Sequence, residues 1–128
     1  EGLGLAARDC YAAMGSMPEE VRLSGGAARS SALRTVLSAA IGAPTRISSR
    51  EEAGAAGAAM MAAVAIGIYP VMPACIADWV TPSLGPVEAN DPDLTALYAR
   101  RYPVYAQARQ ALAPVWQGLS NPQDVQDA

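Results

Sequence analysis

The sequence contains no histidine and little charge of either sign. Without histidine, the chain cannot form a Ser-His-Asp triad, a Cys-His nucleophile pair or a histidine metal site. Lys and Arg together number 9 against 12 Asp and Glu, and the net charge of −3 leaves no basic stripe for nucleic acid or for an anionic membrane surface. We therefore expect neither a nucleic-acid partner nor a membrane partner.

Cysteine is also scarce, and Cys10 and Cys75 match no metal-binding or redox spacing. We expect both to be buried thiols in a reducing compartment, which predicts a cytoplasmic protein. No basic-then-apolar signal peptide opens the chain, and its first residue is Glu1 rather than Met, with helix-like sequence from the start. We therefore expect the chain to be cut from a longer protein.

What the sequence has in abundance is apolar residues, which make up 52% of 128 positions and are sufficient for one domain with a real core. Residues 21–31 carry the most informative pattern: a short alternating strand, then Gly25 and Gly26, then a helix start capped by Ser30 or Ser31. Free N–H groups at a helix start attract phosphate, so this turn is a candidate anion site. The alternative is a tight βα turn that binds nothing.

The rest of the pattern predicts further elements on either side of that turn. In chain order we expect a helix over residues 3–14, a helix over 31–41, a strand over 45–48, an uncharged helix over 53–69, a short helix over 73–80, a loop over 81–90 and a long helix from residue 92. A strand, helix and strand of this length form a βαβ unit, so the two strands should be parallel.

The uncharged helix over 53–69 is rich in alanine and glycine. Ser49 and Glu52 are spaced as a capping box at its start, and Pro70 should end it. The run is short for a membrane span, so we expect a buried helix packed on the preceding strand-and-helix layer. Small residues such as Gly57 allow a helix, a strand or a flat ligand to approach closely.

The last helix has Asp91 as a candidate N-cap and Pro92 at its first position. We expect Pro103 to kink this helix and Pro114 to kink or end its second half. Three tyrosines recur at helical spacing, which favours core packing with hydroxyls at the rim over a stacking platform: Tyr98, Tyr102 and Tyr105.

Several motifs together resemble the C-terminal domain of the FGGY carbohydrate kinases. They are Ser24-Gly25-Gly26-Ala27-Ala28-Arg29-Ser30, Glu51-Glu52-Ala53-Gly54-Ala55-Ala56-Gly57-Ala58-Ala59, Gly67-Ile68-Tyr69, and Leu94 and Tyr98 followed by Tyr102-Pro103-Val104-Tyr105. The resemblance extends from Glu1 to about Leu119, and residues 78–82 resemble a stretch of erythritol and related polyol kinases. In the helix over 31–41, Ala32-Leu33 replaces an aromatic residue often found in the family, and Ala39 replaces a common Asp. We interpret both differences as packing changes.

This resemblance implies an α/β fold, part of an actin-like ATPase (ribonuclease H-like) domain with short parallel strands and a mostly helical remainder. Residues 1–120 would be the C-terminal portion of a nucleotide-binding domain, and 121–128 a frayed polar tail. The family transfers the γ-phosphoryl group of ATP, with Mg²⁺, to a hydroxyl of a sugar or polyol. Carried over by motif, the nucleotide contacts are Gly25, Gly26, Ala27 and Ser30.

The family's catalytic Asp and its Asp-x-Gly-Thr phosphate turn are not found in this sequence. We therefore assign no catalytic residue and no metal ligand, and we expect the chain to be inactive alone. Apolar surface left exposed would favour self-association into a homo-oligomer. The alternative function is a non-catalytic helical interaction module that docks through its Ala/Gly-rich face.

Overall fold

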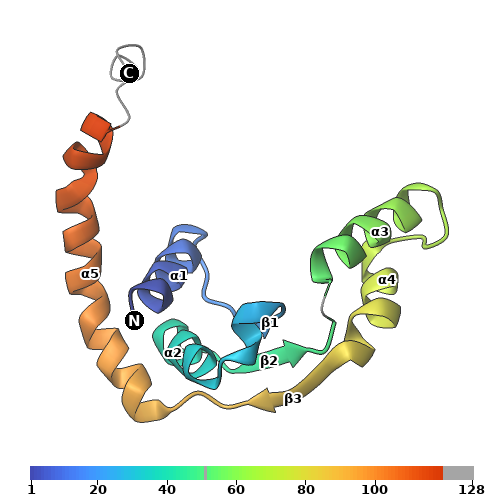
Figure 1. Ribbon diagram of the computed structural model, residues 1–128, viewed down its shortest axis with the longest axis horizontal. Helices are drawn as coiled ribbons and strands as arrows, with labels where there is room; N and C mark the ends of the chain where they lie inside the picture. Colours follow the sequence, from blue (N-terminus) through green and yellow to red (C-terminus); the bar gives the residue numbers. More distant parts are fainter. Residues whose placement is uncertain (51, 120–128) are drawn as a thin grey trace.

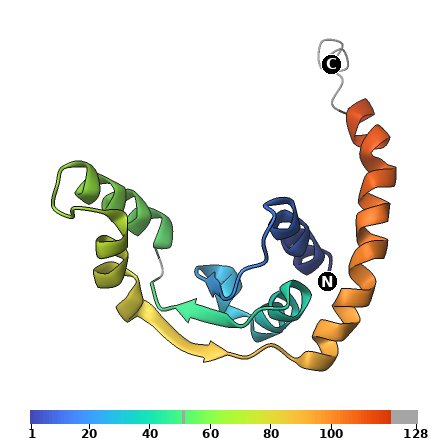
Figure 2. The same cartoon turned by 180° about the vertical axis from the view of Figure 1, so that it is seen from behind.

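The computed structural model describes residues 1–50 and 52–119, which form a curved molecule with a helix and sheet layer at its centre (Figure 1). The α3–α4 hairpin lies on one side of this centre and the long helix α5 on the other, as the reverse view also shows (Figure 2). The elements in chain order are α1 (Gly2–Ala13), β1 (Val21–Leu23), a 3₁₀ helix (Gly26–Arg29), α2 (Ser31–Ile41), β2 (Thr45–Ser48), α3 (Ala53–Ala65), α4 (Met72–Trp79), a second 3₁₀ helix (Thr81–Ser83), β3 (Leu84–Glu88) and α5 (Pro92–Leu119).

The sheet has the order β1-β2-β3 and is mixed. β1 and β2 are parallel with Val21 opposite Thr45, which confirms the predicted βαβ unit. β3 pairs with β2 in the antiparallel sense, so the prediction of a loop over 81–90 was wrong. Gly85 and Pro86 read as loop residues, but β3 lies at the edge of the sheet, where proline needs no partner for its missing N–H.

Helix α2 occupies the centre because its buried face is built from small residues. Ala39 and Ala40 are fully buried and pack with Leu5 of α1 and Tyr98 of α5. Tyr102 and Tyr105 pack at the margin of the same cluster, which confirms the predicted core role of the tyrosines. A second cluster joins β1 to the end of α2 through Val21, Ile41 and Ala43.

The ends of α2 are those expected from the sequence. The Ser30 hydroxyl accepts a hydrogen bond from the N–H of Leu33 at 3.3 Å, so Ser30 rather than Ser31 is the cap. Gly42 ends the helix with a φ of +82° and donates to the carbonyl of Ser38 at 2.8 Å. Both caps fix where the glycine turn leaves β1 and where β2 begins.

Helix α3 differs most from its prediction. Glu52 is the N-cap residue but makes no capping hydrogen bond, and Ser49 donates instead to the carbonyl of Ser83 at 3.2 Å, so the capping box was wrong. The helix ends at Ala65, before Gly67 with a φ of +80°, rather than at Pro70. Glu51 lies outside the described residues.

The expected burial of α3 was also wrong. Met60 and Ala63 are its buried residues, and the helix packs on α4 rather than on the β1–α2 layer. Alanine and glycine dominate every side of this helix, so its sequence has no apolar face that could indicate a packing direction. Cys75 on α4 is buried as predicted, whereas Cys10 on α1 is exposed.

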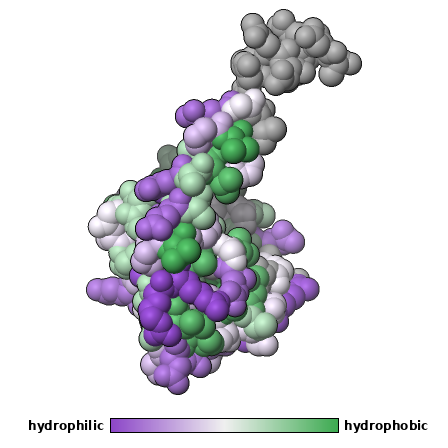
Figure 3. All heavy atoms as spheres, turned by 90° about the vertical axis from the view of Figure 1, so that its left-hand side faces the viewer, coloured by the Kyte–Doolittle hydropathy of each residue, from purple (hydrophilic) through white to green (hydrophobic). Residues whose placement is uncertain are grey.

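Helix α5 is capped by Asp91, whose carboxylate accepts hydrogen bonds from the N–H groups of Asp93 and Leu94 at 2.9 and 3.0 Å. The helix continues through Pro103 and Pro114, so the second proline does not end it. Figure 3, which faces this side of the molecule, shows hydrophobic patches between hydrophilic side chains. Within the part of the chain that is described, no helix has the length and apolar character needed to cross a membrane.

Two helical glycines provide a matched test of this packing. A Cβ at Gly4 would lie 3.1 Å from Ala40 Cβ and 3.1 Å from Val36 Cγ1, whereas a Cβ at Gly57 meets nothing within 4 Å. Gly4→Leu is expected to destabilise the chain by about 1–3 kcal/mol through overpacking between α1 and α2. Gly57→Leu should not lower the urea midpoint, because its side chain would be placed in open space and leucine favours the helix more than glycine does. The sequence, by contrast, predicted that α3 is buried against the preceding layer. Equal shifts in the two midpoints would contradict the packing described here.

The contact between α1 and α5 should depend on pH. Tyr102 donates a hydrogen bond to Asp9 at 2.9 Å, and this bond, followed by desolvation and by the charge of Asp9, raises the pKa of the tyrosine above its ordinary 10.0. The folded state therefore holds the proton more tightly than the unfolded state does. The resulting stabilisation is present below pH 10 and is lost as the pH rises through the raised pKa. Urea unfolding between pH 8 and 11 should show this loss, and Tyr102→Phe should remove it.

Candidate functional site

The glycine turn lies at the carboxyl end of β1, beside the carboxyl end of its parallel neighbour β2. Gly25 has a φ of +73°, a backbone conformation that favours glycine, and it turns the chain out of the strand. Gly26 then begins the 3₁₀ helix that precedes α2. A Cβ at either position would meet nothing within 4 Å, so the backbone of the turn is open to a ligand.

A cavity of about 440 Å³ adjoins this turn, and we call it the glycine-turn cavity. Its lining residues come from the turn, from α2 and from the end of β2: Gly25, Ala28, Arg29, Arg34, Ile47, Ser48, Ser49 and Arg50. Three of these are arginines, whose planar guanidinium groups suit phosphate and carboxylate oxygens. The cavity can therefore receive an anionic ligand beside open backbone N–H groups.

Arg34 is held in place by two hydrogen bonds. It donates to the Glu88 carboxylate at 2.9 Å and to the carbonyl of Ala28 at 2.7 Å. These bonds tie α2 to β3 and to the 3₁₀ helix that follows the glycines. Arg34 thus fixes the shape of the cavity wall, and Glu88 offsets part of its charge.

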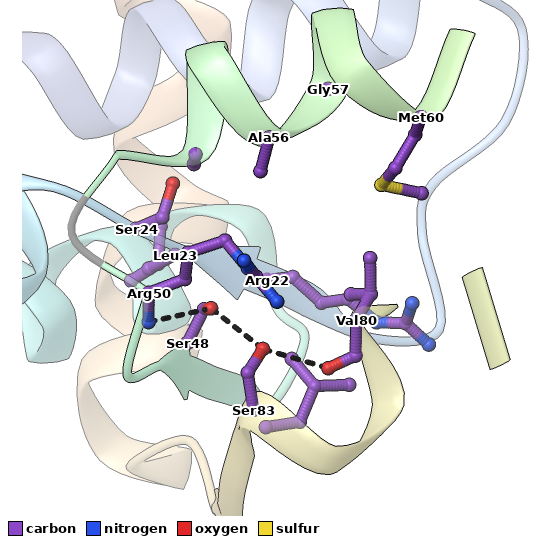
Figure 4. Close-up of a pocket in the computed structure, with 12 residues that line it drawn as sticks. Arg22, Leu23, Ser24, Ser48, Arg50, Ala56, Gly57, Met60, Val80 and Ser83 are labelled. Atoms are coloured by element: carbon purple, nitrogen blue, oxygen red, sulfur yellow. Dashed lines mark hydrogen bonds between the residues drawn. The ribbon is translucent and has the colours of Figure 1, made fainter. Parts of the chain in front are cut away.

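A second cavity of about 210 Å³ lies between α3 and the sheet, and we call it the hairpin cavity. Ala56, Gly57 and Met60 of α3 face polar residues on the opposite side, among them Ser48, Arg50 and Ser83 (Figure 4). Its lining is completed by Arg22, Leu23, Ser24, Ala53, Val80 and Leu84. Ser48 and Arg50 line both cavities, so the two spaces share a wall at the end of β2.

The residues that the sequence predicted for nucleotide contact are only partly gathered here. Gly25 lines the glycine-turn cavity, and Gly26 follows it in the exposed turn without lining either cavity. Ala27 lies in the same 3₁₀ helix as Gly26. Ser30 is not a lining residue either, and its hydroxyl caps α2.

The arginines are the part of the site that sequence reasoning missed. Arginines occur within or just after both strands, but the net negative charge of the whole chain does not reveal this local concentration. Arg22 and Arg46 lie opposite each other on β1 and β2 and share Glu20, at 3.1 and 3.8 Å. Arg50 follows β2 by two residues and crosses to the carbonyl of Trp79 at 2.7 Å.

The described residues include no group of three or more His, Cys, Asp or Glu side chains that could hold a metal ion. Carboxylates are the side chains that Mg²⁺ prefers, and Glu88, beside the glycine-turn cavity, is paired with Arg34. The arginines and the open backbone of the turn thus fit phosphate groups.

The chain is similar to known proteins in both sequence and fold. The model of the FGGY family of carbohydrate kinases, C-terminal domain, matches residues 1–66. Erythritol kinase from Brucella abortus (strain 2308) is 64% identical over 121 residues, which cover 94% of this chain and 23% of that protein. The chain therefore spans about a quarter of the length of this curated relative.

Solved structures with the same architecture include two kinases from Lactobacillus acidophilus. Ligand-bound xylulose kinase has a TM-score of 0.68 at 20% identity, over 89% of this chain and 24% of that one. Gluconate kinase has a TM-score of 0.64 at 21% identity, over 80% and 20%. These likenesses confirm the expected fold, part of an actin-like ATPase domain. The family model, which matches just over half of the chain, shows that the chain belongs to the FGGY family of carbohydrate kinases.

Proposed function

We propose that this chain is the ATP-side portion of a kinase that transfers the γ-phosphoryl group of ATP to a hydroxyl of erythritol or a closely related polyol. The observation that carries the proposal is the open Gly25-Gly26 backbone beside an arginine-lined cavity, in a member of this family. The identity of 64% to an erythritol kinase supports the substrate class.

The chemistry of the site suits a triphosphate. Backbone N–H groups at the Gly25-Gly26 turn can donate to phosphate oxygens, and no side chain blocks their approach. Arg29, Arg34 and Arg50 around the same cavity add positive charge that favours an anion. Phosphoryl transfer depends on such positioning and on neutralising charge from both sides of the phosphates. This chain supplies one side.

The nucleotide contacts that we propose are Gly25, Gly26, Ala27 and Ser30, within a C-terminal domain portion that spans residues 1–120. The small residues Ala53 and Gly57, which line the hairpin cavity, support a second wall for the nucleotide. Mg²⁺ would accompany ATP and be held by carboxylates outside this chain, where the general base would also lie. The cysteines are both free, which supports a reducing, cytoplasmic location.

The exposed side of α3 favours a second candidate function, a helical interaction module. Met61, Ile66 and Ile68 in and after this helix are 62%, 73% and 66% exposed. Such a surface can dock a partner helix or a second copy of the chain. In the kinase this same surface would face other parts of the protein, so the two candidates differ in whether catalysis accompanies docking.

A coupled assay of the full-length protein tests the proposal. With ATP and Mg²⁺, a panel of tetritols, pentitols, glycerol and sugars should show the highest kcat/KM for erythritol or a close relative. Absence of ATP-dependent phosphorylation across the panel, with the protein folded, would contradict the kinase and leave the interaction module.

A further inference from the structure

Arg50 occupies the wall between the two cavities and holds the α3–α4 hairpin against the sheet. Its guanidinium Nη2 donates to the carbonyl of Trp79 at 2.7 Å, and its Cζ lies 6.0 Å from the centre of the Trp79 ring. Its backbone N–H donates to the hydroxyl of Ser48 at 3.2 Å, which places the residue firmly at the end of β2 (Figure 4). Arg50 therefore joins the strand to the far end of α4.

Trp79 is itself fixed inside the hairpin. Its indole N–H donates to the hydroxyl of Tyr69 at 3.1 Å, and that hydroxyl donates to the carboxylate of Asp78 at 3.2 Å. The group formed by these three residues links the loop after α3 to the end of α4. Because Arg50 holds Trp79, it holds the hairpin as a unit.

Among the described residues, Ser83 also joins the hairpin to the end of β2. Ser83, just after α4, shares a hydrogen bond with the Ser48 hydroxyl at 3.0 Å, and its carbonyl accepts from the N–H of Ser49 at 2.8 Å and from the Ser49 hydroxyl at 3.2 Å. Helix α3 packs on α4, and the hairpin cavity separates α3 from β1. The position of α3 over that cavity thus depends on two sets of contacts at the end of β2: those of Ser83, and the hydrogen bond from Arg50 to Trp79. Only the second of these involves a charged side chain.

We infer that Arg50 is a positioning residue for the nucleotide: by holding Trp79, it keeps the small-residue side of α3 in place as a wall next to the glycine turn. This rests on the proposed function, and it adds a residue that the glycine motif does not contain. Loss of Arg50 would let the hairpin move away from the sheet. ATP affinity would fall, whereas the polyol site and the reacting atoms would be untouched.

The test compares Arg50→Ala, Arg50→Lys and Arg22→Ala in the full-length protein. Arg22 is the matched control because it also lines the hairpin cavity and carries the same charge, but it pairs with Glu20 and not with the hairpin. For each variant, calorimetry gives the Kd for ATP, hydrogen exchange gives the protection of residues 53–79, and a coupled assay gives kcat and the KM for the polyol.

We expect Arg50→Ala to raise the Kd for ATP about tenfold, as the loss of a charged hydrogen bond would. Exchange in residues 53–79 should accelerate, while kcat and the KM for the polyol stay within about twofold. Arg50→Lys, which keeps the positive charge and can still donate to the carbonyl of Trp79, should recover part of the affinity. Arg22→Ala should raise the Kd for ATP less than Arg50→Ala does, and it should leave exchange in residues 53–79 at the wild-type rate.

Two results would overturn this role. An unchanged Kd for ATP in Arg50→Ala would show that Arg50 does not position the nucleotide. An equal rise in the Kd for Arg22→Ala would show that Arg50 acts only through its positive charge in the cavity, and not by holding the hairpin. A wild-type protein that binds ATP but phosphorylates no polyol would contradict the proposed function alone, because the ATP affinities and the exchange of the hairpin still report on Arg50.

Discussion

Replacing Gly26 by valine is expected to weaken ATP binding by the full-length protein about 10- to 100-fold without lowering its melting temperature. A hydrogen bond to a charged group contributes about 1.5–3 kcal/mol, which corresponds to that range when one phosphate contact is lost. The β-branched side chain would extend into the approach to the turn. The fold should tolerate it, because a Cβ at Gly26 meets nothing within 4 Å and the residue does not adopt a positive φ.

Gly25 provides the contrast within the same turn. Its φ of +73° makes valine strained there whatever the space, so Gly25→Val should lower the melting temperature as well as the ATP affinity. Calorimetric titration and thermal unfolding of both variants separate the two effects. A Gly26→Val protein with wild-type affinity and wild-type melting would remove the turn from the nucleotide site.

The largest effect on stability is expected at Tyr98. This residue is 3% exposed and packs in the cluster that joins α5 to α1 and α2 through Leu5 and Ala40. Tyr98→Ala should destabilise the chain by about 3–5 kcal/mol, since it removes a large aromatic side chain and leaves a cavity. The denaturant unfolding curve of this variant should lose most of its cooperative transition, because a cost of this size is a large fraction of the free energy of unfolding of a small domain.

Val104 on the same helix is the control for Tyr98. It is 66% exposed, so Val104→Ala should change the free energy of unfolding by no more than about 0.5 kcal/mol. If Tyr98→Ala had an equally small effect, α5 would not be anchored through this cluster, and the packing of α2 between α1 and α5 would be wrong.

The sequence predicted those elements whose residues alternate in polarity or mark a helix end. Alternation at Val21 and Leu23 indicated β1, and Ser30 and Gly42 marked the two ends of α2. Helix α3 could not be placed in the same way, because alanine and glycine on all its sides favour no face. β3 was missed because Pro86 is typical of loops, and only its place at the sheet edge makes it acceptable in a strand.

The glycine motif indicated the turn that adjoins the cavity, but no pattern in the sequence indicated the arginines around it. Gly25 lies beside the cavity, whereas the hydroxyl of Ser30 is used as a helix cap. Arg34 and Arg50 come together only because α2 and the end of β2 meet in space, which no local pattern reveals. Net charge averages over the whole chain and therefore hides such a local concentration of positive charge.

The central claim is that this chain is one side of an ATP cleft, and a calorimetric titration of ATP–Mg²⁺ into the purified 128-residue chain, beside a coupled kinase assay, tests it most directly. The glycine turn alone offers N–H groups, while the opposite phosphate turn and the Mg²⁺ ligands are not found in this sequence. We therefore predict no turnover with any polyol and a Kd near the millimolar range, about −4 kcal/mol. Micromolar affinity or polyol-dependent turnover would show instead that the chain is a self-sufficient enzyme, and would contradict the account.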